Sequence, residues 1–186
     1  MLTHKGTISI DTPLILLRRF TADDAQAMFD NWASHSDTTR FLTWPTHRNV
    51  GISKMVLEDW IARYEQDDYY QWAIVWKQTM EPIGSIAVVS LDNDIQKAEI
   101  GYCIGKPWWH KGITTQALSA VIRFLFDEVG INRIQARHDP RNPFSGAVMR
   151  KCGMTYEGTL RESDRNNQGI CDIVHYAILR SDFEIR

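Results

Sequence analysis

The segment Pro107–Phe126 reads PWWHKGITTQALSAVIRFLF, in which aromatic residues, basic residues and one glycine lead into an apolar pattern with the period of a helix. A strand-like segment, Lys97–Gly105, precedes it, and Gly130 follows it. Glycine is the residue that most often follows the end of a helix. We therefore expect a strand, a short loop, and a helix that begins near Thr114 or Thr115 and stops at Gly130.

The start of this expected helix has the properties of an anion-binding site. The first N–H groups of a helix have no partner within it and carry partial positive charge. Gly112 permits close approach of the backbone to a ligand, and the small Thr114 and Thr115 keep that approach open and add hydroxyl donors. Lys111 and His110 add positive charge nearby. A threonine-capped turn without any ligand fits the same residues. The sequence contains neither GxGxxG nor GxxxxGK followed by Ser or Thr, so nothing indicates a dinucleotide or nucleoside triphosphate site.

The rest of the chain alternates strand-like and helix-like segments without repeats or linkers. A strand at Leu14–Phe20 precedes a helix capped by Thr21 and Asp24, and a second helix is expected at Ser53–Tyr64. Further strands are expected at residues 70–77, 82–91, 97–105, 131–139, 154–163 and 170–179, with a last helix at 142–153. The order predicts a mixed α/β sheet. Trp32, Trp60, Trp72 and Trp76 are expected in its core, and Asp164–Asn167 are expected to form a solvated hairpin tip.

Composition and charge exclude several classes of protein. The 186 residues are 44% hydrophobic and 24% charged, which suits one globular domain. A net charge of −2 and the lack of a basic run argue against nucleic-acid binding and against a membrane surface role. Three widely spaced cysteines and scattered histidines indicate neither a disulfide framework nor a metal site. No apolar run resembles a signal peptide or a membrane span, so we expect a cytoplasmic protein.

Three segments in order, AEIGYCIGKPWWHKGITTQAL, RNPFSGAVMRKCGM and YEGTLR, resemble the GNAT superfamily of acetyl-CoA-dependent N-acetyltransferases. Within it, they resemble the branch of ribosomal-protein N-terminal alanine and serine acetyltransferases. The resemblance extends from about Leu14 to Leu179 and implies a single domain at residues 14–180, after an N-terminal extension at 1–13. It also implies the GNAT fold of class α/β (α+β): a mixed, mostly antiparallel, twisted sheet of about six to seven strands flanked by helices.

The resemblance implies a site for coenzyme A as acetyl carrier, and no metal. The backbone after the central strand would wrap the pyrophosphate, with Gly112 in the family's glycine position, Trp109 in its Gln or Arg position and Thr114 in its last small position. The strand itself would separate from its neighbour at Asn132–Arg137 and pair with the pantetheine arm, and Asn142 would match the family's N-x-x-S pattern. The implied coenzyme residues are Cys103, Ile104, Trp109, His110, Lys111, Gly112, Ile113, Thr114, Thr115, Asn142 and Ser145.

The reaction requires a base for the attacking amine and donors for the oxyanion. Glu99 is the candidate base because a carboxylate within an apolar strand suits that role, although a plain solvent-facing glutamate beside Lys97 fits the pattern too. A backbone N–H near Cys103 or Ile104 would hold the oxyanion. Many members of the family carry a tyrosine acid where this chain has Met149. The acid role then falls to Ser145, to Tyr176 or to water.

The acceptor is expected to be an amine, as a protein N-terminal Ala or Ser or as a small or antibiotic amine. Trp44, Tyr102 and Tyr176 are candidate acceptor residues, while a packed loop explains Trp44 equally well. A non-catalytic coenzyme A sensor and an unrelated phosphate-binding protein are the alternatives from other classes. A monomer and a homodimer both fit the sequence.

Overall fold

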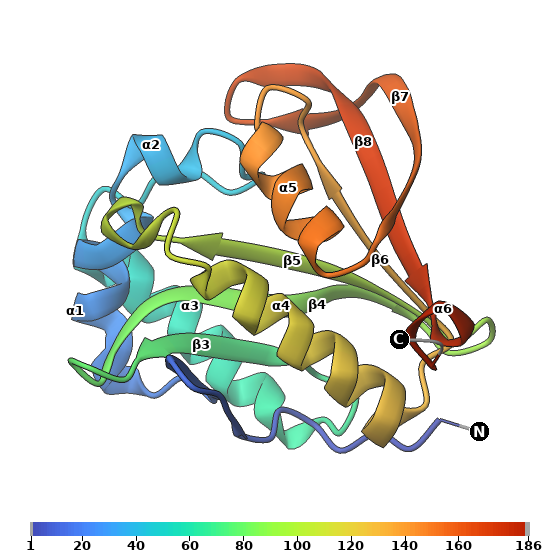
Figure 1. Cartoon of the computed structure of the whole chain (residues 1–186). Coiled ribbons are helices and arrows are strands. Elements are labelled where there is room, and N and C mark those ends of the chain that lie inside the picture. Colours follow the sequence, from blue (N-terminus) through green and yellow to red (C-terminus); the bar gives the residue numbers. More distant parts are fainter. Residues whose placement is uncertain (1, 185–186) are drawn as a thin grey trace.

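The computed structural model describes residues 2–184, which form one eight-stranded sheet in the order β1-β2-β3-β4-β5-β6-β8-β7 (Figure 1). All neighbouring strands are antiparallel except the central pair, β5 and β6. The strands are β1 (Ile10–Asp11), β2 (Ile15–Arg18), β3 (Gln71–Trp76), β4 (Glu81–Asp92), β5 (Lys97–Ile104), β6 (Arg133–His138), β7 (Thr155–Asn166) and β8 (Gly169–Leu179). The helices are α1 (Ala25–Met28), α2 (Ser36–Thr39), α3 (Val50–Ala62), α4 (Ile113–Phe124), α5 (Pro143–Lys151) and α6 (Arg180–Glu184).

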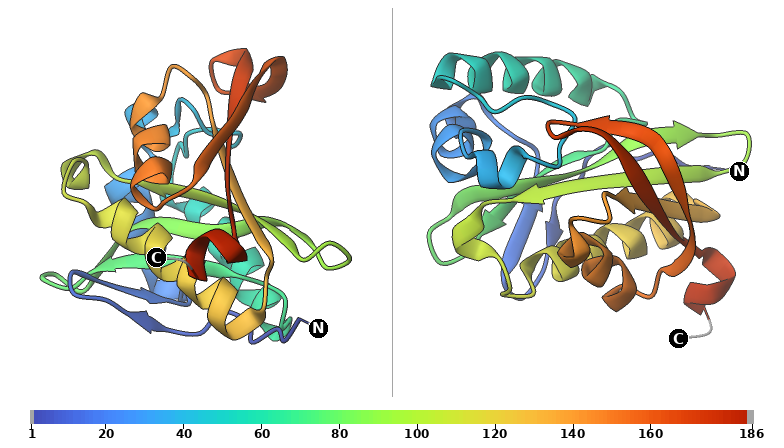
Figure 2. Two further views of the ribbon diagram at one scale, coloured as in Figure 1. Left: turned by 45° about the vertical axis from the view of Figure 1, so that its right-hand side comes forward. Right: turned by 90° about the horizontal axis from the view of Figure 1, so that it is seen from above.

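Helices cover both faces of the sheet, with α1 to α3 on one face and α4 and α5 on the other (Figure 2). The strand β3 is apolar from Trp72 to Trp76, and it needs a core on each side of the sheet because side chains alternate between faces along a strand. Trp72 and Ile74 pack beneath α4 in the larger core, whereas Ala73 and Val75 pack against the α1–α3 side. Both faces of β3 are therefore buried.

The parallel pair β5 and β6 separates part-way along its length. Lys97, Ala98 and Glu99 pair with Arg133, Ile134 and Gln135, and the pairing ends there. Residues 100–104 of β5 continue to pair with β4, and residues 136–138 of β6 continue to pair with β8. The separation that the family resemblance implied is present. It leaves backbone groups of β5 on one edge without a strand partner, which is unusual inside a sheet.

Several elements differ from the sequence prediction. An eighth strand, β1, pairs with β2 but has only two residues, too few to show alternation. The first helix is broken into a 3₁₀ turn, α1 and a π-helical turn at Phe29–Ala33. The second begins at Val50 because Asn49 caps it, and α2 lies in the connection before it. The expected hairpin tip is wrong, because β7 continues to Asn166 and only residues 167–168 form the turn.

No helix within residues 2–184 is both long and apolar enough to cross a membrane. Residues 3–12, which lie before the expected domain, are attached to the sheet by specific bonds. The Trp72 indole donates to the Ile8 carbonyl at 2.7 Å, and the Thr7 hydroxyl donates to the Tyr69 carbonyl at 2.9 Å. Trp72 and Trp32 are completely buried, as expected, and Trp60 and Trp76 are partly buried against the two cores.

Candidate active site

The loop that follows β5 ends at Gly112, which immediately precedes α4. The helix begins at Ile113, one residue earlier than predicted, and Gly112 has a left-handed backbone with φ of 75°. A Cβ atom placed on Gly112 would meet no heavy atom within 4 Å. The space in front of the first helical turn is therefore open, and the N–H groups of that turn have no partner within the helix. This geometry fits a bound phosphate group.

Trp109 holds the loop against the separated end of β5. Its indole nitrogen donates a hydrogen bond of 2.8 Å to the Ile104 carbonyl, and its ring packs on the larger core. One residue back, the Cys103 thiol lies 3.4 Å from the Ser85 hydroxyl, and burial raises the pKa of that thiol. A protonated thiol is a poor nucleophile, so the raised pKa of Cys103 favours direct transfer over an acetyl-cysteine intermediate.

Ser145 faces the split between β5 and β6 from the first turns of α5. The Tyr102 hydroxyl lies 3.0 Å from both the backbone carbonyl and the side-chain oxygen of Ser145, and it joins β5 to α5 across the split. Burial raises the pKa of Tyr102, so its phenol is neutral at physiological pH. Asn142 precedes the helix as predicted, but its side chain forms no capping bond.

On the opposite face of the sheet, Glu99 belongs to a polar cluster that joins three strands. Its carboxylate forms an ion pair with Arg137 at 2.8 Å and accepts a hydrogen bond from Gln135 at 2.7 Å. Arg137 also pairs with Asp164 of β7 at 3.0 Å. The side chain of Glu99 is 13% exposed. The glutamate is thus held by Arg137 and Gln135 and is mostly buried, not solvent-facing as the alternative interpretation supposed.

The β7–β8 hairpin reaches over the sheet and meets the loop after α2 (Figure 2, right). The side-chain amide of Asn167 donates to the carbonyls of Thr39 at 2.9 Å and Trp44 at 2.7 Å, and its backbone N–H donates to Leu42 at 3.1 Å. Trp44 itself packs on His47, with ring centroids 5.3 Å apart. We call this connection between residues 39–44 and Asn167 the strap.

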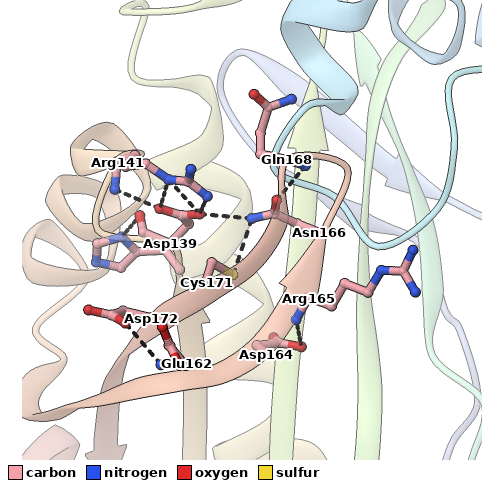
Figure 3. Close-up of polar contacts among 10 residues, drawn as sticks. Asp139, Arg141, Glu162, Asp164, Arg165, Asn166, Gln168, Cys171 and Asp172 are labelled. Atoms are coloured by element: carbon pink, nitrogen blue, oxygen red, sulfur yellow. Dashed lines mark hydrogen bonds and ion pairs between the residues drawn. The ribbon is translucent and has the colours of Figure 1, made fainter.

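A buried carboxylate anchors the other side of the hairpin tip (Figure 3). Asp139, whose side chain is 1% exposed, accepts bonds from Arg141 at 2.6 Å and from the Asn166 amide at 2.8 Å. Burial by itself would raise the pKa of Asp139. The bonds from Arg141 and Asn166 outweigh burial and lower the pKa to about 2. The tip that the sequence predicted to be solvated is therefore fixed from both sides.

Replacing Asp139 with asparagine is expected to destabilise the protein at pH 7 by roughly 1–3 kcal/mol, because an amide N–H would face the Asn166 donor. The folded pKa of Asp139 lies below the ordinary value near 3.9, so its stabilisation is complete above that value and is lost as pH falls from about 4 to 2. Urea unfolding at pH 7 and at pH 3 measures both effects. An undiminished difference between variant and wild type at pH 3 would contradict the assignment; Asp23→Asn, at an exposed position, is the control.

Tyr176 and Met149 lie beneath α5. The Tyr176 hydroxyl is 3.0 Å from the guanidinium of Arg150, from which it accepts a hydrogen bond, and the tyrosine is 5% exposed. Met149 is 1% exposed and belongs to the larger core. Met149 has no proton to donate, whereas the Tyr176 phenol keeps its own O–H while it accepts the bond from Arg150. Within residues 2–184 no three His, Cys, Asp or Glu side chains are grouped as metal ligands would be.

The chain matches the acetyltransferase (GNAT) domain family over residues 15–155. It belongs to the GNAT family. This GNAT protein is therefore an acetyl-CoA-dependent N-acetyltransferase, and the predicted family, mixed sheet and enzyme class are confirmed.

Some relatives of this GNAT enzyme are named for an acceptor and others are not. The uncharacterized N-acetyltransferase YoaA of Bacillus subtilis is 28% identical over 171 residues, which cover 92% of this chain and 96% of YoaA. The ribosomal protein uS5-alanine N-acetyltransferase of Escherichia coli is 36% identical over 63 residues, 34% of this chain and 32% of that protein. A structure described as RimL, a ribosomal L7/L12 alpha-N-protein acetyltransferase, in complex with coenzyme A has a TM-score of 0.82 at 19% identity, and the match covers 92% of this chain and 98% of that one.

Sequence reasoning missed three residues of this GNAT site. Arg137 belongs to no recognisable motif, and only the order of strands in the sheet brings it between Glu99 and Asp164. Asn167 stood in a run of turn-forming residues whose usual position is solvent. Asp139 had a local signal, because an aspartate followed by proline and arginine after a strand favours a side-chain-supported turn.

Proposed function

We propose that this GNAT enzyme transfers the acetyl group of acetyl-CoA to the N-terminal amine of a protein that begins with Ala or Ser. The strap carries this proposal. It extends over the face of the sheet that bears Glu99, on the side away from α4 and α5. An acceptor that enters beside such a strap must be slender, and an extended chain terminus is slender. The E. coli relative named for uS5-alanine acetylation supports the same class of acceptor.

Coenzyme A is proposed to bind on the side of α4 and α5. The open space at Gly112 would take the pyrophosphate, with donors from Ile113, Thr114 and Thr115 at the helix start. The unpaired edge of β5 around Cys103 and Ile104 would pair with the peptide-like arm. The remaining proposed contacts are Trp109, His110, Lys111, Asn142 and Ser145. Bound acetyl-CoA supplies an activated thioester, and the protein supplies orientation and electrostatics.

Glu99 is proposed to receive the proton of the attacking amine, directly or through water. It lies where β5 and β6 separate, so it is next to the free edge of β5, where a coenzyme arm could replace a strand. Arg137 and Gln135 hold its two oxygens in fixed positions. A backbone N–H on the free edge of β5 near Cys103 or Ile104 is proposed to stabilise the oxyanion.

Ser145 is proposed as the group nearest the departing sulfur. Ser145→Ala is expected to lower kcat by less than tenfold, because a thiolate of pKa near 8.5 leaves without much assistance and serine is a poor acid. Tyr102 would keep its bond to the Ser145 backbone carbonyl in the variant, so the fold should be preserved. Steady-state kinetics at saturating acetyl-CoA measure the effect. A loss of 100-fold or more would place the serine at the centre of the chemistry.

Two assays separate this proposal from its alternatives. Calorimetry with acetyl-CoA, ATP and inorganic phosphate tests the coenzyme site, and binding of phosphate or ATP in preference to acetyl-CoA would favour the phosphate-binding alternative. Thiol release is then measured with peptides that begin with Ala, Ser or acetylated Ala, and with a panel of small amines. We expect turnover with free Ala and Ser termini only. Turnover confined to small amines would overturn the acceptor class, and tight acetyl-CoA binding without turnover would indicate a sensor.

A further inference from the structure

Phe144 is a large apolar side chain left 63% exposed in the first turn of α5. Its ring contacts one other aromatic ring, that of His110, with centroids 4.7 Å apart and planes at 77°. This edge-to-face geometry is a favourable one for aromatic pairs. The pair belongs to neither apolar core. Packing of the protein interior therefore does not explain why a phenylalanine stands there.

The position of the pair relates it to the split in the sheet. His110 lies in the loop that leads from β5 to α4, and Phe144 lies where the chain has passed from β6 into α5. The contact thus joins the segment that follows β5 to the segment that follows β6, beyond the point at which the two strands separate. Gly112, with its open space, is two residues after His110, and Asn142 is two residues before Phe144.

The backbone of His110 is also unusual. Its φ of 60° is in the left-handed region, which residues other than glycine rarely adopt and which costs of order 1 kcal/mol or more. Such a conformation persists only where surrounding structure holds it. In this loop the His110 imidazole contacts Phe144 of α5.

We propose that Phe144 and His110 form an aromatic clasp that packs on the pantetheine arm of bound coenzyme A. The inference rests on the proposed coenzyme site and assigns Phe144 as a coenzyme-contacting residue. The arm carries two methyl groups between its amides and the pyrophosphate, and aromatic rings favour contact with such groups. Phe144 has the exposed apolar surface for that contact, and burial of that surface would strengthen binding.

The test compares Phe144→Ala with Met55→Ala, which removes another largely exposed apolar side chain, from α3 on the opposite face of the sheet. Calorimetry is run with coenzyme A and with 3′-phospho-ADP, which lacks the pantetheine arm. We expect Phe144→Ala to weaken coenzyme A binding roughly tenfold, the equivalent of partial burial of one phenylalanine, and to leave 3′-phospho-ADP binding within twofold. Met55→Ala should change neither, and Phe144→Tyr should retain most of the affinity.

The outcomes distinguish the clasp from the coenzyme site itself. Failure of the wild type to bind coenzyme A would overturn the proposed function. Normal binding by wild type with equal affinity in Phe144→Ala would overturn only the clasp. An equal loss for coenzyme A and 3′-phospho-ADP would place Phe144 on the nucleotide and overturn its assignment to the arm. Circular dichroism of each variant excludes unfolding as the cause.

Discussion

Glu99→Gln is expected to lower kcat by roughly 10²–10⁴, the usual contribution of a general base. The substitution keeps the length of the side chain and an acceptor oxygen for Arg137 or Gln135, so the cluster should remain assembled. What it removes is the capacity to accept a proton from the amine. The affinity for acetyl-CoA should stay within about threefold of wild type, since the coenzyme is proposed to bind on the face of the sheet that carries α4 and α5.

Asp164→Asn is the matched control, because Asp164 is the second carboxylate bound to Arg137. If the guanidinium alone matters, for its charge or its position, both variants should be impaired alike. If Glu99 is the base, Glu99→Gln should be at least tenfold the more damaging. A rate for Glu99→Gln within threefold of wild type, together with a large loss in Asp164→Asn, would transfer the base role to Asp164.

The comparison of these two carboxylates also shows how far sequence reasoning extends. Glu99 could be predicted from the sequence because the alternation of side chains in β5 and the neighbouring family motif are local patterns. Asp164 could not be predicted, because its contact with Arg137 depends on the sheet order, in which β8 lies between β6 and β7. Strand order depends on long-range pairing, which leaves no period in the sequence.

Local signals also failed where tertiary contacts outweighed them. Asn142 has the residue type and position of a cap, yet its backbone is twisted away from capping geometry. The run Asp164–Asn167 has turn composition, yet Asp139 and the loop after α2 supply partners that extend the strand to Asn166. In contrast, Gly112 and Gly130 lie directly before and after the helical segment, as predicted. Both have a left-handed backbone, which strongly favours glycine.

Gly112→Glu is expected to weaken coenzyme A binding by about 100-fold, which corresponds to about 3 kcal/mol. The added side chain would project into the space in front of the first turn of α4, where no protein atom opposes it. Its carboxylate would then repel the pyrophosphate that this turn is proposed to hold. Two like charges about 4 Å apart near a protein surface repel each other by several kcal/mol.

Two further variants isolate the charge from the backbone effect. A residue other than glycine at φ of 75° is strained, so Gly112→Gln should lose some stability and a smaller part of the affinity. Gly169→Glu creates a similar strain in the hairpin, at φ of 100° with equally open space, and should leave coenzyme A binding unchanged. The difference between the Glu and Gln variants at position 112 should also shrink as salt is raised, because exposed charges are screened. Equal affinities for those two variants at low salt would mean that the pyrophosphate lies elsewhere.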